Sequence, residues 1–350
     1  MKVEEHYMFK EAVEGPSAVR RTLSECRSEV EEVAEALKKA EVRRGFIVGS
    51  GTSFHASLYL QYLINRYTDL HFTAVPASEF KAWKPIKGKY VVIGFSQSGE
   101  SSDVIEAVRE AKAAGVLTIG ITNTPGSSLT RLADHSVVTR AGEEKAVTAT
   151  KTFDVQLAAS LMIVRAITGG GFDDLTEAVN AVERVIKSKD KLREFASRLK
   201  EAGSVYVLGR GATYPIALEF ALKLKEAAMI HAEGFAVREF LHGPVQLVDE
   251  GTPVYLLLGS REAFKESEVA LKKIQSYKPA WVYVGPRAEG VETYFKGSEV
   301  EFEGVEGDAA VLPVVKAAQL VAYYASVARG LNPDKPTKLT KVVKYESETG

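Results

Sequence analysis

The sequence predicts an α/β protein built from two similar units, each a parallel sheet covered by helices on both faces. Short, continuously apolar runs alternate with helical patterns along the chain, as expected for parallel strands buried on both sides. Two of these runs end in a Gly-x-Gly turn before a helix, at Gly49 and at Gly209. The length of 350 residues also favours two domains over one core.

The first half of the chain is predicted to contain a helical lead-in, residues 1–44, and an α/β unit, residues 45–172. Apolar residues recur at helical spacing over 17–39 in the lead-in. Helices are expected at 54–66 and 103–114. The expected strands are 45–49, 72–75, 90–95, 116–122 and 136–139.

The second half repeats this pattern after a charged helical connection, residues 173–203. A second α/β unit is expected over 204–330, and its final helix is followed by a proline-containing run that is incompatible with a continuing helix. The remaining residues, 331–350, form a tail. The expected strands of this unit are 205–209, 253–258 and 280–284, and later helices are expected at 262–276 and 309–329.

Composition excludes several classes of function. A net charge of −1 gives no electrostatic reason to expect a nucleic-acid partner. Cys26 is the one cysteine, which favours a reducing compartment. The N-terminus has no signal-peptide pattern, and the apolar stretch 157–164 is too short to span a bilayer. We therefore expect a cytoplasmic protein without membrane contact.

The sequence predicts neither a metal site nor a nucleotide cofactor. The six histidines are scattered, and none follows another at i, i+4 spacing. Phe54 and Tyr214 stand where a dinucleotide-binding fingerprint needs a third small residue. We therefore expect catalysis, if any, without a cofactor.

Two hydroxyl-rich loops in the first half are candidates for binding a phosphate group. Each follows a predicted strand and leads into a helix, where backbone N–H groups and the helix dipole attract anions. Neither contains lysine, which argues against a nucleotide P-loop. The alternative is that the hydroxyl groups only cap the helices. The candidate residues are Gly51, Thr52 and Ser53 in one loop, and Ser96, Gln97, Ser98, Gly99, Glu100 and Ser101 in the other.

A charged stripe crosses an otherwise apolar helix in the second half. Glu219, Lys223 and Glu226 share one narrow face, and His242 follows in a Gly-Pro turn. A carboxylate, an amine and an imidazole could together transfer protons. The alternative is an ion-pair ladder that only stabilises the helix.

These motifs together resemble the sugar isomerase (SIS) family. The resemblance covers nearly the whole chain and is strongest to the isomerase half of glucosamine-6-phosphate synthase and to archaeal-type glucosamine-6-phosphate deaminases. It implies two tandem flavodoxin-like units, each a three-layer αβα sandwich around a parallel five-stranded sheet. The motifs that carry it are residues 96–101, 123–129, 221–226 and 239–244.

The resemblance also implies a role for each candidate residue. It assigns sugar-phosphate binding to Ser96, Gln97, Ser98 and Ser101, with Gly51, Thr52, Ser53 and Val147 lining the same pocket. Glu226 would move a proton between C1 and C2, and His242, from a neighbouring subunit, would open the sugar ring. Lys341 would form a Schiff base with the ketose, supported by Lys223 and Glu219.

Several functions remain open after this resemblance. We favour a deaminase that interconverts glucosamine 6-phosphate with fructose 6-phosphate and ammonia. Because residue 2 is lysine, we do not expect glutamine hydrolysis through an N-terminal cysteine. The alternatives are an isomerase subunit supplied by a separate glutaminase, another phosphosugar isomerase or a deglycase, and a phosphosugar-sensing module. The enzyme is expected to be a homodimer with shared active sites.

Overall fold

The computed structural model describes residues 3–84 and 88–342, and the chain divides into two compact units. We name each unit after its sheet. The β1–β5 unit comprises Ser17–Glu144, Lys151–Phe172 and the chain from Thr340 onward. The β6–β10 unit comprises the chain up to Pro16, Lys145–Thr150 and Asp173–Leu339. The boundaries 45–172 and 204–330 expected from the sequence remain predictions.

The β1–β5 unit contains one five-stranded parallel sheet in the order β2-β1-β3-β4-β5. In the centre of the sheet, Ile47 of β1 is paired with Ala74 of β2 and with Ile93 of β3. The strands are β1 (Arg44–Gly49), β2 (His71–Pro76), β3 (Val91–Phe95), β4 (Thr118–Thr122) and β5 (His135–Val138). All five strands predicted for the first half are therefore present.

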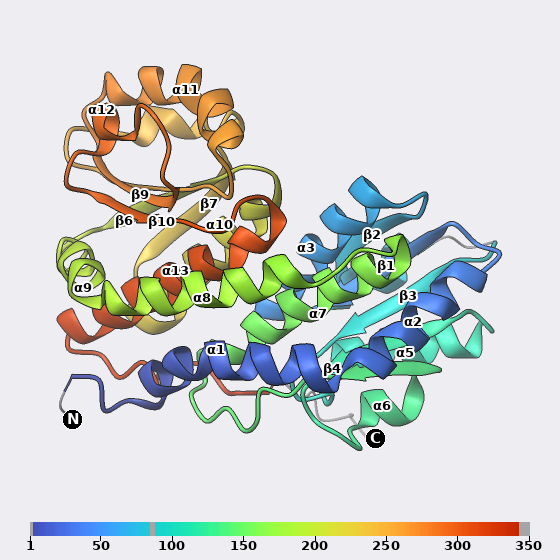
Figure 1. The fold of residues 1–350 in the computed structure, drawn as a ribbon. Coiled ribbons are helices and arrows are strands. Elements are labelled where there is room, and N and C mark those ends of the chain that lie inside the picture. The colour runs from blue at the N-terminus through green and yellow to red at the C-terminus, as the bar shows by residue number, and fades with distance from the viewer. Residues whose placement is uncertain (1–2, 85–87, 343–350) are drawn as a thin grey trace. The chain divides into compact units, whose positions relative to one another are not determined.

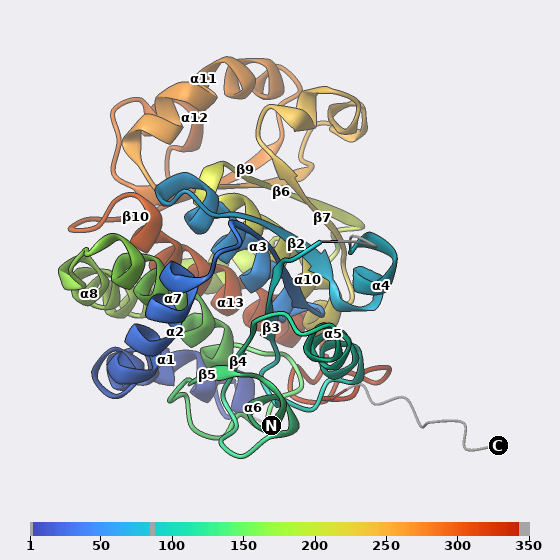
Figure 2. The same ribbon diagram turned by 90° about the vertical axis from the view of Figure 1, so that its right-hand side faces the viewer.

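Helices cover both faces of this sheet (Figures 1 and 2). The helices α3 (Thr52–Tyr67) and α7 (Lys151–Thr168) pack together on one face, and α2 (Arg27–Lys39) packs on α7. The opposite face carries α4 (Phe80–Trp83), α5 (Ser102–Ala113) and α6 (Ser128–Leu132). The preceding helix, α1 (Tyr7–Glu25), passes from one unit into the other at Pro16.

The β6–β10 unit repeats this plan with the order β10-β9-β8-β6-β7. Read from the other edge, the order matches the first sheet strand for strand, so β6, β7, β8, β9 and β10 correspond to β1, β2, β3, β4 and β5. The strands are β6 (Ser204–Gly209), β7 (His231–Ala236), β8 (Pro253–Leu257), β9 (Ala280–Pro286) and β10 (Glu299–Phe302). The predicted pair of parallel five-stranded α/β units is confirmed.

The helices of the β6–β10 unit also form two layers around its sheet. In Figure 1, α11 (Arg261–Gln275) and α12 (Val291–Phe295) lie on one side of the sheet, and α10 (Tyr214–Ala228) and α13 (Val311–Ala328) lie on the other. The predicted connection forms α8 (Asp173–Lys187) and α9 (Lys189–Ser197). Both of these helices contact α13, so they belong to the packed body of this unit.

Matching glycines explain why each unit needs the Gly-x-Gly turn after its first strand. A Cβ atom on Gly49 would lie 2.5 Å from the carbonyl oxygen of Ser53, and one on Gly209 would lie 2.3 Å from that of Thr213. The second glycines, Gly51 and Gly211, have φ values of 54° and 58°. Such positive φ values favour glycine, so both turns have the same steric requirement.

One helix in the described part of the chain is long and apolar enough to cross a membrane. It covers Asp308–Ala328, and 94% of its most apolar window is buried inside the structure. The same helix contacts α8, α9 and α10. It is therefore packed as a core helix.

Candidate functional site

The Ser96–Ser101 loop joins the carboxyl end of β3 to the N-terminus of α5. The amide N–H of Gly99 donates to Ser96 Oγ over 3.0 Å, and the amide N–H of Glu100 donates to Ser98 Oγ over 3.1 Å. Gln97 accepts a 3.0 Å hydrogen bond from the amide of Asn123 through its carbonyl oxygen. These contacts fix the loop as a compact turn above the end of the sheet.

Gly99 allows the loop to pack against the following loop. Its φ is 66°, and a Cβ atom there would lie only 2.1 Å from Ser127 Oγ. Ser127 is buried, and its Oγ has no hydrogen-bond partner within the described residues. An unsatisfied buried hydroxyl is unusual in a folded protein, and a polar ligand at this loop could satisfy it.

Ser101 does not act as a conventional helix cap. It is the N-cap residue of α5, yet its side chain makes no capping hydrogen bond. The hydroxyl and the first N–H groups of α5 are therefore in a position that suits a bound anion. For Ser101, this arrangement weighs against the alternative that the hydroxyl only caps the helix.

Glu100 fixes the neighbouring loop, a role that the sequence did not reveal. Its two carboxylate oxygens accept hydrogen bonds from the amide and the hydroxyl of Ser128, both over 2.8 Å. The carboxylate is thus directed to the N-terminus of α6. Glu100 therefore acts as a structural clamp between the two loops.

The second predicted loop lies at the same edge of the sheet, because β1 and β3 are adjacent parallel strands. Gly51 is the N-cap residue of α3, and Thr52 and Ser53 form its first turn. Ser53 is buried and its Oγ accepts a 3.1 Å hydrogen bond from Gln156 Nε2 of α7. The structure therefore brings the two hydroxyl-rich loops to one end of the sheet.

The tail lysine has a buried partner in the same unit. Lys341 Nζ lies 2.7 Å from Glu144 Oε2, and the side chain of Glu144 is fully buried. The same carboxylate accepts hydrogen bonds from the amide and the hydroxyl of Thr152 at the start of α7, over 3.2 and 2.7 Å. Sequence analysis missed Glu144, because no local pattern links it to a residue 197 positions away.

The charged stripe of α10 lies in the β6–β10 unit. Lys223 is buried, and its Nζ lies 3.3 Å from Glu219 Oε1 and forms a second ion pair with Glu226 Oε2. Burial alone would lower the pKa of the Lys223 ammonium. The two carboxylates outweigh burial, so the pKa of Lys223 is raised and the side chain stays cationic.

Glu226 is the accessible end of this stripe. Its side chain is 22% exposed, whereas that of Glu219 is 2% exposed. Glu226 also lines a cavity of about 560 Å³, together with Met229, Ile230 and the chain segment that contains Leu331 and Leu339. Of the two carboxylates that pair with Lys223, Glu226 is the one that a ligand can reach.

His242 is exposed within the β6–β10 unit. It follows a short 3-10 helix, Glu239–Leu241, and its amide donates to the carbonyl of Glu239 over 2.9 Å. The next residue, Gly243, has a φ of 134°, which favours glycine. The turn therefore presents the imidazole at the surface of this unit.

Val147 lies in a segment that is held by buried polar groups. Its amide donates to the carbonyl of Asp334 over 3.0 Å. Nearby, Gln319 Nε2 donates to the carbonyl of Thr150 over 3.1 Å, and the buried Lys316 ammonium donates to Gln319 Oε1 over 2.6 Å. Two side chains of the core helix α13 therefore fix the Lys145–Thr150 segment.

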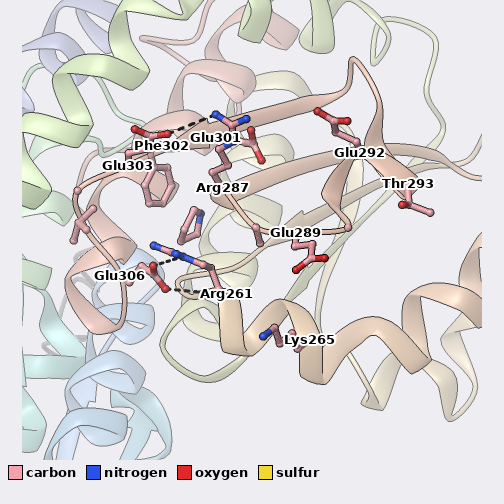
Figure 3. Close-up of a pocket in the computed structure, with 15 residues that line it drawn as sticks. Arg261, Lys265, Arg287, Glu289, Glu292, Thr293, Glu301, Phe302, Glu303 and Glu306 are labelled. Atoms are coloured by element: carbon pink, nitrogen blue, oxygen red, sulfur yellow. Dashed lines mark hydrogen bonds and ion pairs between the residues drawn. The ribbon is translucent and has the colours of Figure 1, made fainter.

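The β6–β10 unit also has a cavity at the carboxyl end of its sheet, with a volume of about 1030 Å³ (Figure 3). None of the predicted site residues lines it. Because α11 corresponds to α5, this is the counterpart of the region around the Ser96–Ser101 loop. Here Glu306 pairs with Arg261 at 2.5 Å and accepts from the Arg261 amide at 3.2 Å. A carboxylate of the protein itself thus occupies the N-terminus of α11.

The predicted residues therefore form two sets that belong to different units. The β1–β5 unit contains both hydroxyl-rich loops and Lys341, and the β6–β10 unit contains Val147, the α10 stripe and His242. In the described residues, no group of three or more His, Cys, Asp or Glu side chains is arranged to hold a metal ion.

Comparison with known protein families gives one match that covers more than half of the chain. The model of the SIS domain matches residues 38–166 and 198–279. Each matched segment includes one of the two sheets' first strands and the helix that follows it.

The chain is also similar to longer proteins named glutamine–fructose-6-phosphate aminotransferase (isomerizing). It is 36% identical to that of Sulfurisphaera tokodaii over 97% of this chain, and 38% identical to that of Methanothermobacter thermautotrophicus over 98%. It spans only 57% and 58% of the lengths of these two relatives.

Two solved structures are similar over nearly their whole length. One is the C-terminal domain of glucosamine-fructose-6-phosphate aminotransferase from Francisella tularensis, with a TM-score of 0.85, 27% identity, and coverage of 94% of this chain and 98% of that one. The other is glucosamine-6-phosphate deaminase from Thermotoga maritima, with a TM-score of 0.77, 25% identity, and coverage of 96% and 99%.

Proposed function

Because the chain belongs to the SIS domain family, we propose that it is a phosphosugar isomerase that interconverts glucosamine 6-phosphate with fructose 6-phosphate and ammonia. The observation that carries this proposal is the Ser96–Ser101 loop, in which the Ser101 hydroxyl does not cap α5 and Gly99 packs against the buried Ser127 hydroxyl. The names of the similar aminotransferases and deaminase support an amino-sugar phosphate as substrate.

We place the phosphate-binding site in the β1–β5 unit because its Ser96–Ser101 loop suits an anion. Its loop combines four uncharged polar side chains, a positive-φ glycine and a helix N-terminus without a competing capping side chain. At the corresponding position of the β6–β10 unit, the carboxylate of Glu306 already accepts from the first amide of α11. A phosphate there would have to displace this carboxylate, so the β1–β5 unit is the better anion site.

Three ionisable side chains carry out the chemistry at the carbon atoms of the sugar. His242 opens the ring of the sugar. The Lys341 amine then attacks the C2 carbonyl of the ketose, and the carbonyl oxygen leaves as water with two hydrogens, which gives a Schiff base. Ammonia replaces the lysine nitrogen at C2, and Glu226 takes a proton from C1 and returns it to C2. The buried Lys223 ammonium forms an ion pair with Glu226 and so holds this carboxylate in place.

A second candidate function differs only in the source of ammonia. The chain spans 57% of the length of an aminotransferase whose name specifies glutamine as donor, so it could act as an isomerase part that receives ammonia from a glutaminase. The exposed His242 favours a homodimer in which the imidazole completes the partner's site. We also propose a cytoplasmic location, where sugar phosphates are metabolised.

One assay tests the proposed reaction and separates these candidates. The pure chain is incubated with glucosamine 6-phosphate, and ammonia and fructose 6-phosphate are measured. Parallel incubations contain fructose 6-phosphate with ammonium or with glutamine. We expect equal amounts of ammonia and fructose 6-phosphate in the first incubation, and amination with ammonium only. No conversion in either direction would contradict the proposal, whereas amination with glutamine only after a glutaminase is added, and none with free ammonium, would favour the glutaminase-supplied isomerase.

A further inference from the structure

Glu144 is a buried carboxylate that accepts hydrogen bonds from Thr152 and Lys341. Its Oε1 accepts from the Thr152 amide, and its Oε2 accepts from both the Thr152 hydroxyl and the Lys341 ammonium. A fully buried carboxylate is costly unless such donors compensate for lost water. Because the carboxylate contacts Thr152 in the first turn of α7, it also interacts favourably with the dipole of that helix.

This arrangement places Lys341 close to a predicted sugar-binding residue of the same unit. Thr152 and Gln156 are one turn apart on α7 and therefore lie on the same face of the helix. Thr152 contacts the Glu144 carboxylate, and Gln156 donates to Ser53 Oγ over 3.1 Å. The Thr152–Glu144 contact and the Gln156–Ser53 contact therefore lie about one helical turn, roughly 5–6 Å, apart along α7. Lys341 Nζ lies 2.7 Å from Glu144 Oε2.

We propose that Glu144 is the positioning residue that holds the Lys341 amine beside the Thr52–Ser53 loop. This inference rests on the proposed function, because it concerns the lysine assigned to Schiff-base formation. The amide and the hydroxyl of Thr152 both donate to Glu144, and these contacts remain when Lys341 leaves the carboxylate. Glu144 can therefore keep its place while the lysine reacts and receive the amine again afterwards.

The side chain of Lys341 needs such a partner. It is 25% exposed and extends from a segment with no assigned helix or strand. A lysine side chain has several rotatable bonds, and holding it in one geometry is entropically costly without a strong partner. A misplacement of about 1 Å at a reacting atom can reduce a rate by about a hundredfold. Removing the carboxylate should therefore slow attack by the amine and leave binding of the phosphate intact.

The test measures Schiff-base formation directly. The whole chain is incubated with fructose 6-phosphate and cyanoborohydride, which reduces an imine to a stable secondary amine, and the label on Lys341 is measured by mass spectrometry. For Glu144→Gln we expect the labelling rate to fall by about tenfold or more, with a Kd for glucitol 6-phosphate within about twofold of wild type. Glucitol 6-phosphate has no carbonyl group, so its Kd reports binding alone.

Two further variants separate positioning from folding. Thr152→Val removes the hydroxyl donor to Glu144 but keeps the amide donor and the lysine pair, so its labelling rate should fall by less than that of Glu144→Gln. Glu144→Asp keeps the charge but draws the carboxylate back, so labelling should fall by several-fold even if Glu144→Gln does not fold. Wild-type labelling rates in both Glu144 variants would overturn the positioning role of Glu144 but would leave the Schiff-base assignment of Lys341 intact. Absence of label on Lys341 in the wild-type chain would overturn the Schiff-base assignment and the inference together.

Discussion

Replacing Gly99 by alanine tests whether the Ser96–Ser101 loop must pack tightly to bind phosphate. Gly99 has a φ of 66°, and the added methyl group would lie 2.1 Å from Ser127 Oγ and 2.4 Å from Ser127 Cβ. The left-handed backbone costs a non-glycine residue about 1–2 kcal/mol. Overpacking against Ser127 adds about 1–3 kcal/mol. Gly99→Ala should therefore lower the free energy of unfolding by about 2–5 kcal/mol.

Gly126 provides a matched control in the adjacent loop. Its φ is 67°, almost the same as that of Gly99, but a Cβ atom there would meet nothing within 4 Å. Gly126→Ala should therefore lower the free energy of unfolding only by the backbone contribution of about 1–2 kcal/mol. The difference between the two variants isolates the steric contact with Ser127.

Urea unfolding and steady-state kinetics provide the measurements. Relative to Gly126→Ala, Gly99→Ala should unfold at lower urea concentration. It should also raise KM for the phosphosugar by at least about tenfold, because the clash with Ser127 displaces the loop from the geometry that suits the phosphate. Equal stability and equal KM in the two variants would refute the reasoning that this contact shapes the site.

Four other predictions concern the proposed site. Ser98→Ala should raise KM for the phosphosugar by removing a phosphate donor, and an unchanged KM in a folded variant would contradict the phosphate site. Lys223→Met should destabilise the chain by about 3–5 kcal/mol, because it leaves two buried or half-buried carboxylates without their cation, and calorimetry should detect the loss. The raised folded pKa of Lys223 stabilises the chain at pH values below the unfolded pKa of about 10.5, and this stabilisation should be lost as the pH rises further. Mixing inactive His242→Ala and Glu226→Gln subunits should restore activity if active sites are shared, whereas no rescue after confirmed subunit exchange would argue for sites within one chain.

The central strands were predictable because they are buried on both faces. Residues 45–49, 90–95 and 205–209 are continuously apolar apart from glycine, and all three form central strands. Two strands were not predicted from the sequence, β7 and β10, and they are the two edge strands of their sheet. In β7, Glu233 and Gly234 interrupt the apolar pattern, and β10 is only four residues long. Edge strands bury less surface, so their sequences carry a weaker signal.

The sequence predicts those parts of the candidate site whose residues are consecutive in the chain. It does not predict the residues whose roles depend on tertiary contacts. The Ser96–Ser101 loop is recognisable because its strand, turn and helix are consecutive. Glu144 and Glu306 act through partners that are distant in the sequence, so their roles emerge only from the folded chain. The cost of burying a carboxylate makes such partners identifiable in the structure.

The central claim is that a phosphosugar bound by this chain exchanges a carbon-bound proton through Glu226. The most direct measurement is the incorporation of solvent deuterium into C2 of glucosamine 6-phosphate. This incorporation is monitored by NMR for the wild-type chain and for Glu226→Gln. We predict incorporation with the wild-type chain and none with Glu226→Gln, while the variant still binds glucitol 6-phosphate. Deuterium incorporation by Glu226→Gln at the wild-type rate would contradict the account.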